Sequence, residues 1–177
     1  MRPLYLTAMA FALAAPVAPR LAAAPGPVSH CQAGETMVYS CGFGRSIGSV
    51  CVSPGSVHYR FGPPGKPALE IASDRDWSNI HRGGVIGGGG GSEVHLRFTR
   101  RDHDYVVFWG EAGQYTDVPG KRWSGIHVAR GDTQLAVLNC KAATQPVDDW
   151  EGLLTRNLPK HLSAVPEDSD PRFDMWF

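Results

Sequence analysis

The 177-residue chain has no excess of charge of either sign and no long hydrophobic segment. It carries 17 Lys and Arg against 17 Asp and Glu, and such a balance argues against a nucleic-acid partner. Its longest uncharged apolar run, residues 4–15, is shorter than the roughly 20 residues that span a bilayer, so we expect no stable membrane span. Phosphate-loop, zinc-protease and nucleophile-elbow motifs are absent as well. No sequence motif therefore indicates a particular class of enzyme.

The N-terminus has the composition of an export signal. Arg2 is followed by the apolar run, and small residues follow that run as far as Ala24. A positive start, a short apolar segment and a small-residue cleavage region are the three parts of a secretory signal. An N-terminal membrane anchor is the alternative, but the apolar run is too short for it. We therefore expect a protein that is periplasmic or secreted once the signal peptide, residues 1–24, is removed.

Four cysteines follow the expected signal peptide: Cys31, Cys41, Cys51 and Cys140. An even number of cysteines in an exported chain is typical of disulfide bonds. Zinc binding is the alternative, but the chain has none of the closely spaced cysteine or histidine pairs of a structural zinc site. We expect two disulfides, and we prefer Cys41–Cys140 with Cys31–Cys51 because joining the first and last strands would close a barrel.

The remaining sequence predicts short strands separated by turns. Glycine and proline are abundant, with 21 and 14 residues, and both favour turns. Apolar and polar residues alternate in Val57, His58, Tyr59, Arg60 and Phe61, the period of a half-buried strand. Expected strands are residues 35–41, 46–53, 56–62, 68–72, 92–99, 105–110, 123–130 and 133–140. The fold class is therefore all-β, a small antiparallel barrel or sandwich of about eight strands with disulfides.

Four segments divide the chain in this interpretation. The signal peptide, residues 1–24, precedes a loose leader at residues 25–34. The β domain covers residues 35–140, and a C-terminal extension covers residues 141–177. The extension contains one short helix within residues 148–158, where apolar residues recur at helical spacing, followed by a polar tail.

Several short motifs in the β domain resemble those of a family of small exported bacterial proteins to which no activity is attached. They are Tyr-Ser-Cys at 39–41, Val-Cys at 50–51, Tyr-Arg-Phe-Gly at 59–62, Gly-Lys-Pro at 65–67 and Tyr-Val-Val-Phe-Trp-Gly at 105–110. The resemblance implies location and architecture only. The layout is also distantly similar to periplasmic and membrane-bound inhibitors of c-type lysozyme. Their Ser-Gly-x-x-Tyr inhibitory loop begins like Ser124–Gly125, although His127 and Val128 follow Ile126 here and the tyrosine is missing.

Three histidines on expected strands, His58, His95 and His127, face away from the predicted core. They would form a metal site only if their strands were neighbours, and outward polar residues are ordinary on a half-buried sheet. We therefore expect no catalytic residues, no metal and no cofactor. An envelope enzyme that uses these histidines with Arg60 and Arg97 is the alternative function.

The preferred function is a binding or inhibitory module for an unknown protein or glycan of the cell envelope. Two long loops, residues 73–91 and 111–122, are expected on a disulfide-bonded scaffold. Trp77, Tyr115 and Trp123 lie in or beside these loops, and large rigid aromatic side chains are common anchors of binding surfaces. The sequence therefore predicts these three residues as the binding site. Packing of Trp77 and Trp123 against the core is the alternative for those two.

Overall fold

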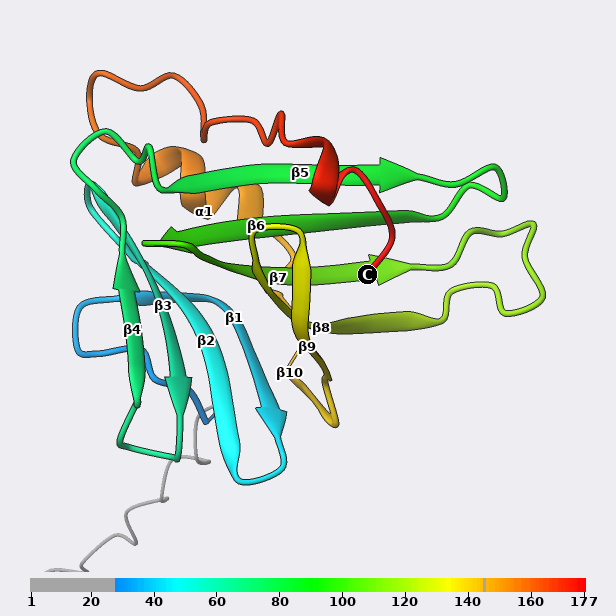
Figure 1. The fold of residues 1–177 in the computed structure, drawn as a ribbon, viewed down its shortest axis with the longest axis horizontal. Coiled ribbons are helices and arrows are strands. Elements are labelled where there is room, and N and C mark those ends of the chain that lie inside the picture. Colours follow the sequence, from blue (N-terminus) through cyan, green and yellow to red (C-terminus); the bar gives the residue numbers. More distant parts are fainter. Residues whose placement is uncertain (1–27, 145) are drawn as a thin grey trace, which may run out of the picture.

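The computed structural model describes residues 28–144 and 146–177, which fold into two antiparallel sheets of five strands each (Figure 1). The expected signal peptide lies outside the described residues. In the first sheet the strand order is β10-β1-β2-β3-β4. These strands are β1 (Thr36–Phe43), β2 (Ser46–Ser53), β3 (Ser56–Gly62), β4 (Leu69–Ala72) and β10 (Ala142–Thr144).

The second sheet has the strand order β5-β6-β7-β8-β9. Its members are β5 (Ile80–Ile86), β6 (Ser92–Arg100), β7 (His103–Glu111), β8 (Arg122–Arg130) and β9 (Thr133–Asn139). One short helix, α1 (Trp150–Arg156), and a 3-10 turn (Pro171–Phe173) follow in the C-terminal extension. The all-β prediction is confirmed, in the form of two sheets that face each other without closing into a barrel.

Strand β5 is the main element that the sequence did not predict, because two adjacent glycines interrupt its pattern. A Cβ atom on Gly83 would overlap the His95 ring, and one on Gly84 would lie 2.6 Å from the Glu93 carbonyl oxygen. Glycine weakens a strand but allows such close approach. The expected loop of residues 73–91 is therefore a connection, a strand and a short turn.

The core lies between the two sheets. Alternating residues of both sheets meet there, as in the stacking of Tyr59 from β3 on Phe98 from β6, with ring centroids 5.4 Å apart. Leu96, Val107 and Ile126 are completely buried in the same cluster. The apolar residues of the alternating pattern thus lie on the strand face that is in the core, and the polar residues lie on the face outside it.

Two disulfides connect the predicted cysteine pairs. Cys41 of β1 bonds to Cys140, which directly follows β9, so this bond links the two sheets. Cys31 bonds to Cys51 of β2. This is the pairing that the sequence analysis preferred, although the reason given for it does not hold, because the barrel is not closed.

The segment of residues 28–34 is fixed to the first sheet, which corrects the expectation of a loose leader there. The buried His30 accepts a hydrogen bond at its backbone oxygen from Arg60, and its backbone N–H donates to Ser49 Oγ at 3.1 Å. Its ring nitrogen Nε2 lies 3.1 Å from the Gly62 carbonyl oxygen. The Glu35 N–H donates to the Gln32 oxygen at 3.1 Å, and this turn leads from the segment into β1.

The C-terminal extension also packs on the β domain. Helix α1 lies at one end of the core, and residues 165–177, here called the C-terminal strap, cross the outer face of the second sheet (Figure 1). Phe173 of the strap is buried against Val106 and Ala129 of that face. No helix in residues 28–144 and 146–177 is long and apolar enough to cross a membrane.

Candidate binding site

Two loops lie together at one end of the second sheet and form what we call the tip, residues 86–91 and 112–121. The Tyr115 backbone N–H donates to the Gly89 oxygen at 3.2 Å, which joins the β5–β6 turn to the β7–β8 loop. Within the longer loop, Ala112 N–H donates to Lys121 O at 2.8 Å. These backbone bonds hold the tip as one ridge, which projects beyond the sheets in Figure 1.

The side chains of the tip are unusually exposed for their size and hydrophobicity. Tyr115 is 90% exposed, Ile86 is 87% exposed and Val118 is 49% exposed. Of the three aromatic residues predicted as binding anchors, Tyr115 is thus the one that the structure presents fully to solvent.

Trp77 and Trp123 are placed differently. Trp77 has no exposed surface, lies in the core and donates its indole N–H to the Gly55 oxygen, so its expected place on a binding surface is corrected. The short β4–β5 connection turns its ring inward, with a backbone φ of 56° at this residue. Trp123, at the start of β8, is half-buried and donates its indole N–H to the buried Glu93 carboxylate. Its ring also packs against Trp176 of the strap, with ring centroids 5.8 Å apart.

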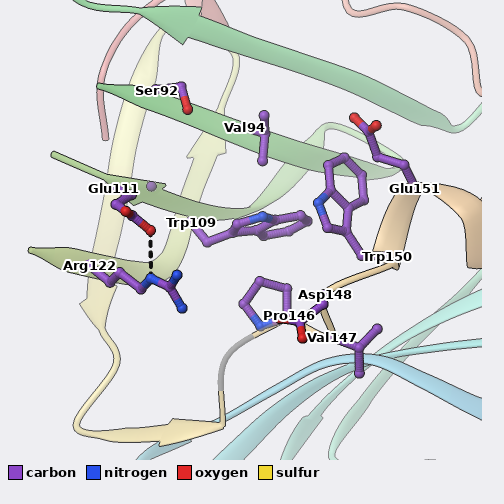
Figure 2. A pocket seen from close by; sticks show the side chains of 11 residues that line it. Ser92, Val94, Trp109, Glu111, Arg122, Pro146, Val147, Asp148, Trp150 and Glu151 are labelled. Carbon is purple, nitrogen blue, oxygen red and sulfur yellow. Dashed lines mark hydrogen bonds and ion pairs between the residues drawn. The ribbon is translucent and has the colours of Figure 1, made fainter. Parts of the chain in front are cut away.

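A pocket of about 370 Å³ opens at the base of the tip, on the inner side of the second sheet. Figure 2 shows Trp109 of β7 and Trp150 of α1 meeting there, with ring centroids 4.8 Å apart and an edge-to-face angle of 86°. Pro146 and Val147, from the segment before α1, line the opposite side. The residues that line the pocket come from β6, β7, β8, α1 and the segment before α1.

Polar groups border the mouth of this pocket. Glu111 at the end of β7 accepts a 2.6 Å hydrogen bond from Arg122 Nε at the start of β8. Ser92, Asp148 and Glu151 also line the pocket. Glu151 is bound by Arg82, whose guanidinium lies over the Trp150 ring at 5.5 Å from its centroid. The pocket therefore combines indole rings with both hydrogen-bond donors and acceptors.

The three outward histidines do not converge. His58 lies on β3 in the first sheet, whereas His95 and His127 lie on β6 and β8 in the second. The Phe177 ring lies within 5.5 Å of the His95 ring and 5.1 Å of the His127 ring, measured between centroids. Both of these histidines are buried beneath the strap. The structure therefore does not bring the three side chains together as a metal site.

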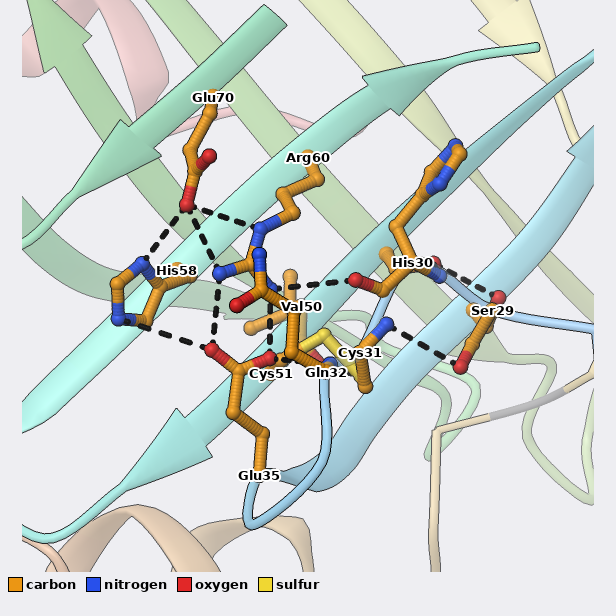
Figure 3. The surroundings of a disulfide bond; sticks show 12 residues. Ser29, His30, Cys31, Gln32, Glu35, Val50, Cys51, His58, Arg60 and Glu70 are labelled. Atoms are coloured by element: carbon orange, nitrogen blue, oxygen red, sulfur yellow. Dashed lines mark hydrogen bonds and ion pairs between the residues drawn. A yellow bond between two sulfur atoms is a disulfide. The ribbon is translucent and has the colours of Figure 1, made fainter. Parts of the chain in front are cut away.

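Arg60 is held in a buried ion-pair cluster beside the Cys31–Cys51 disulfide (Figure 3). Its two terminal nitrogens donate to the two Glu35 oxygens at 2.6 and 2.8 Å, and its Nε donates to Glu70 at 2.9 Å. These hydrogen bonds from Arg60 lower the pKa of Glu35. Although Cys31, Glu35 and Cys51 lie close enough to suggest a metal site, both sulfur atoms are committed to the disulfide.

Arg97 is also held in an ion-pair cluster, which lies beneath the strap. Its Nε and a terminal nitrogen donate to the two Asp168 oxygens, each at 2.7 Å, and another nitrogen donates to Asp104 at 3.1 Å. Asp168 also lies 3.1 Å from His95 Nε2. Burial alone would raise the pKa of Asp168, but the hydrogen bonds from Arg97 and His95 outweigh it and hold that pKa well below its usual range.

His127 makes stability sensitive to mild acid. Burial beneath the strap lowers its pKa, so below about pH 6.5, the usual histidine pKa, the unfolded chain binds a proton that the folded chain binds less readily. Stability is therefore present above that pH and is lost as the pH falls toward the folded-state pKa. We expect the melting temperature to drop between about pH 7.5 and pH 5.5, and to drop less in His127→Gln.

The exposed Leu135 on β9 provides the control for this measurement, because its side chain does not titrate. The variant Leu135→Ala should keep the full drop in melting temperature. An identical pH dependence in wild type and His127→Gln would contradict the assignment to His127.

The tip and the pocket were only partly visible in the sequence. The sequence identifies the loop of residues 111–122 and Tyr115, whereas it places Trp109 only within the expected strand of residues 105–110 and Trp150 only within the expected helix of residues 148–158. Contact between these two tryptophans depends on how the C-terminal extension packs, and no local pattern encodes it. Comparisons with protein-family models, with curated proteins and with solved structures find no match for this chain.

Proposed function

We propose that this chain is an exported, non-catalytic binding or inhibitory module that engages a macromolecular partner of the cell envelope through its tip. The observation that carries the proposal is the 90% exposure of Tyr115 on a ridge held by backbone hydrogen bonds. A rigid aromatic residue loses little conformational entropy on binding and offers a large contact area. Ile86 and Val118 extend the apolar surface of the same ridge.

The proposed location rests on chemistry as well as on the N-terminal sequence. Two disulfides persist in the oxidising conditions outside the cytoplasm. Together with the signal-like residues 1–24, they support a periplasmic or secreted protein.

The enzyme alternative receives less support from the geometry. Arg60 and Arg97 are buried and each is paired with two carboxylates of its own chain. Arg60 shares Glu35 with His58, and Arg97 shares Asp168 with His95, but these two clusters lie on different sheets, so the described residues do not bring both arginines and all three histidines into one pocket. A substrate would have to displace an internal ion pair before either guanidinium could act.

An inhibitory role of the kind that the distant resemblance implies would have to use the tip. Ser124, Ile126 and His127 lie within β8 and are buried. The residues that resemble the start of the inhibitory loop are therefore part of the sheet, and the projecting tyrosine of this chain is Tyr115. A lysozyme inhibition assay with wild type and Tyr115→Ala tests this specific form of the proposal.

Tyr115→Ala should weaken partner binding with little effect on folding. Loss of a central aromatic anchor reduces affinity by about 30-fold or more, while an exposed side chain contributes within about 0.5 kcal/mol to stability. The measurement is quantitative affinity capture from an envelope extract, followed by titration of the recovered partner and by thermal melts of both proteins.

Leu135→Ala is the matched control, because Leu135 is an exposed apolar residue, 50% accessible, on β9 and outside the tip. It should leave binding unchanged. Equal binding by wild type and Tyr115→Ala, or an equal loss in both variants, would refute a tip-mediated interaction.

A further inference from the structure

The pocket at the base of the tip is a second candidate site, distinct from the exposed side chains of the ridge. Neither Tyr115 nor Val118 lines it. Its volume of about 370 Å³ falls in the range of small-ligand sites, which is roughly 300–1,000 Å³. We propose that this pocket binds a neutral pyranose sugar, as a free saccharide or as the end of a glycan chain.

The aromatic part of the pocket suits the apolar face of a pyranose ring. One side of such a ring presents C–H groups, which pack on the π-face or edge of an indole. Trp109 and Trp150 meet at 86°, so they form two walls of a corner. Trp109 is in turn fixed from behind by Tyr39, with ring centroids 5.9 Å apart and planes 20° from parallel. The corner is therefore preformed, which lowers the entropic cost of binding.

The polar part suits the hydroxyl groups around that ring. A sugar hydroxyl both donates and accepts hydrogen bonds, so a sugar site needs both functions at its rim. Carboxylates of Glu111, Asp148 and Glu151 accept, and the guanidinium of Arg122 donates. The Glu111–Arg122 pair places an acceptor beside a donor, an arrangement that matches two neighbouring hydroxyl groups.

The charges at the pocket favour a neutral ligand over a cation. Glu111 is paired with Arg122, and Glu151 is paired with Arg82. The Arg82 guanidinium already occupies one face of the Trp150 ring and places a positive charge beside the pocket, which disfavours a cation there, and a sugar would pack on the free part of that ring or on Trp109. Asp148 is then the one lining carboxylate without an ion pair in the described chain, and its side chain is exposed.

The test uses the mature chain and follows its tryptophan indole N–H signals by two-dimensional NMR during titration with cellobiose and, separately, chitobiose. We expect at least one disaccharide to shift the indole signals of Trp109 and Trp150, with the signal of the buried Trp77 unchanged. Trp150→Phe identifies one of the two signals. Absence of a saturable shift with both disaccharides would overturn the proposal, as would a shift of these signals by tetramethylammonium alone.

Two matched arginine variants place the site. Arg122 and Arg130 lie at opposite ends of β8, and each is exposed and makes a 2.6 Å ion pair through Nε, with Glu111 and Asp102 respectively. Arg122→Ala should weaken disaccharide binding about tenfold by removing a charged donor, whereas Arg130→Ala should leave it unchanged. Equal effects of the two variants would place the sugar elsewhere and overturn the proposal.

The two proposals fail separately. Tyr115→Ala should keep disaccharide binding, because its side chain does not line the pocket. Capture of a partner that depends on Tyr115, without any disaccharide binding, would refute the sugar site and leave the tip proposal standing. Disaccharide binding, with partner capture that does not depend on Tyr115, would support the sugar site and refute the tip proposal.

Discussion

Replacing Cys41 and Cys140 together by alanine is expected to lower the free energy of unfolding by about 4–5 kcal/mol. The disulfide joins residues 99 positions apart, so its removal releases a long loop in the unfolded chain. In the folded protein it connects β1 of the first sheet to the end of β9 in the second. Urea unfolding under non-reducing conditions, with wild type and the double variant in parallel, measures this loss.

The second disulfide provides an internal control. Cys31 and Cys51 are 20 positions apart, and the loop-entropy relation predicts that their removal costs about 1.4 kcal/mol less than removal of the long-range bond. Both double variants replace two cysteines of the same domain, so their comparison isolates loop length. A larger loss for Cys31/Cys51 than for Cys41/Cys140 would contradict the view that the long-range bond is the main covalent link between the sheets.

Asp168→Ala is expected to destabilise the fold by about 3 kcal/mol or more, because it leaves the buried Arg97 without its bidentate partner. The same change removes the ion pair between the strap and β6, whereas the backbone hydrogen bonds of Pro166 and residue 168 with Arg82 remain. For a domain of this size the loss corresponds to a drop in melting temperature of roughly 10 °C. Differential scanning calorimetry at neutral pH measures it.

Asp102→Ala is the control for this prediction. Asp102 pairs with Arg130 through an exposed contact of 2.6 Å, and exposed ion pairs contribute about 1 kcal/mol or less. If Asp168→Ala were no more harmful than Asp102→Ala, the strap would not be held by its ion pair with Arg97.

The Asp168 ion pair also predicts a pH dependence. The pKa of Asp168 is lower in the folded protein than in the unfolded chain, where it is about 3.9. Its contribution to stability is therefore fully present above that value and is lost as the pH falls through the lower, folded-state pKa. In Asp168→Ala this part of the acid dependence should be absent.

Strand positions were predictable because each strand has one face in the core. In β3, Val57, Tyr59 and Phe61 alternate with His58 and Arg60, and the structure gives Ser56–Gly62 as the strand. Two disulfides were predictable from the even number of cysteines, whereas their pairing was preferred for a barrel closure that the structure does not have. The period of a strand and the number of cysteines are features that a single sequence carries.

The remaining features depend on contacts between distant segments. His95 and His127 alternate like solvent-facing residues, but the strap covers them, and nothing in the local pattern of β6 or β8 encodes that cover. Trp77 lies in a polar segment, yet the turn between β4 and β5 directs its ring into the core. The Trp109–Trp150 corner likewise requires the packing of α1 against β7.

The central claim is that the tip makes the contact with a partner, and site-specific photo-crosslinking tests it most directly. A photoreactive amino acid replaces either Val118 on the tip or Leu135 on β9, since both side chains are about half exposed, and the protein is irradiated in an envelope extract. We expect a discrete crosslinked product from position 118 that excess unlabelled wild-type protein suppresses, with no such product from position 135. A competed product from position 135 alone would contradict this claim.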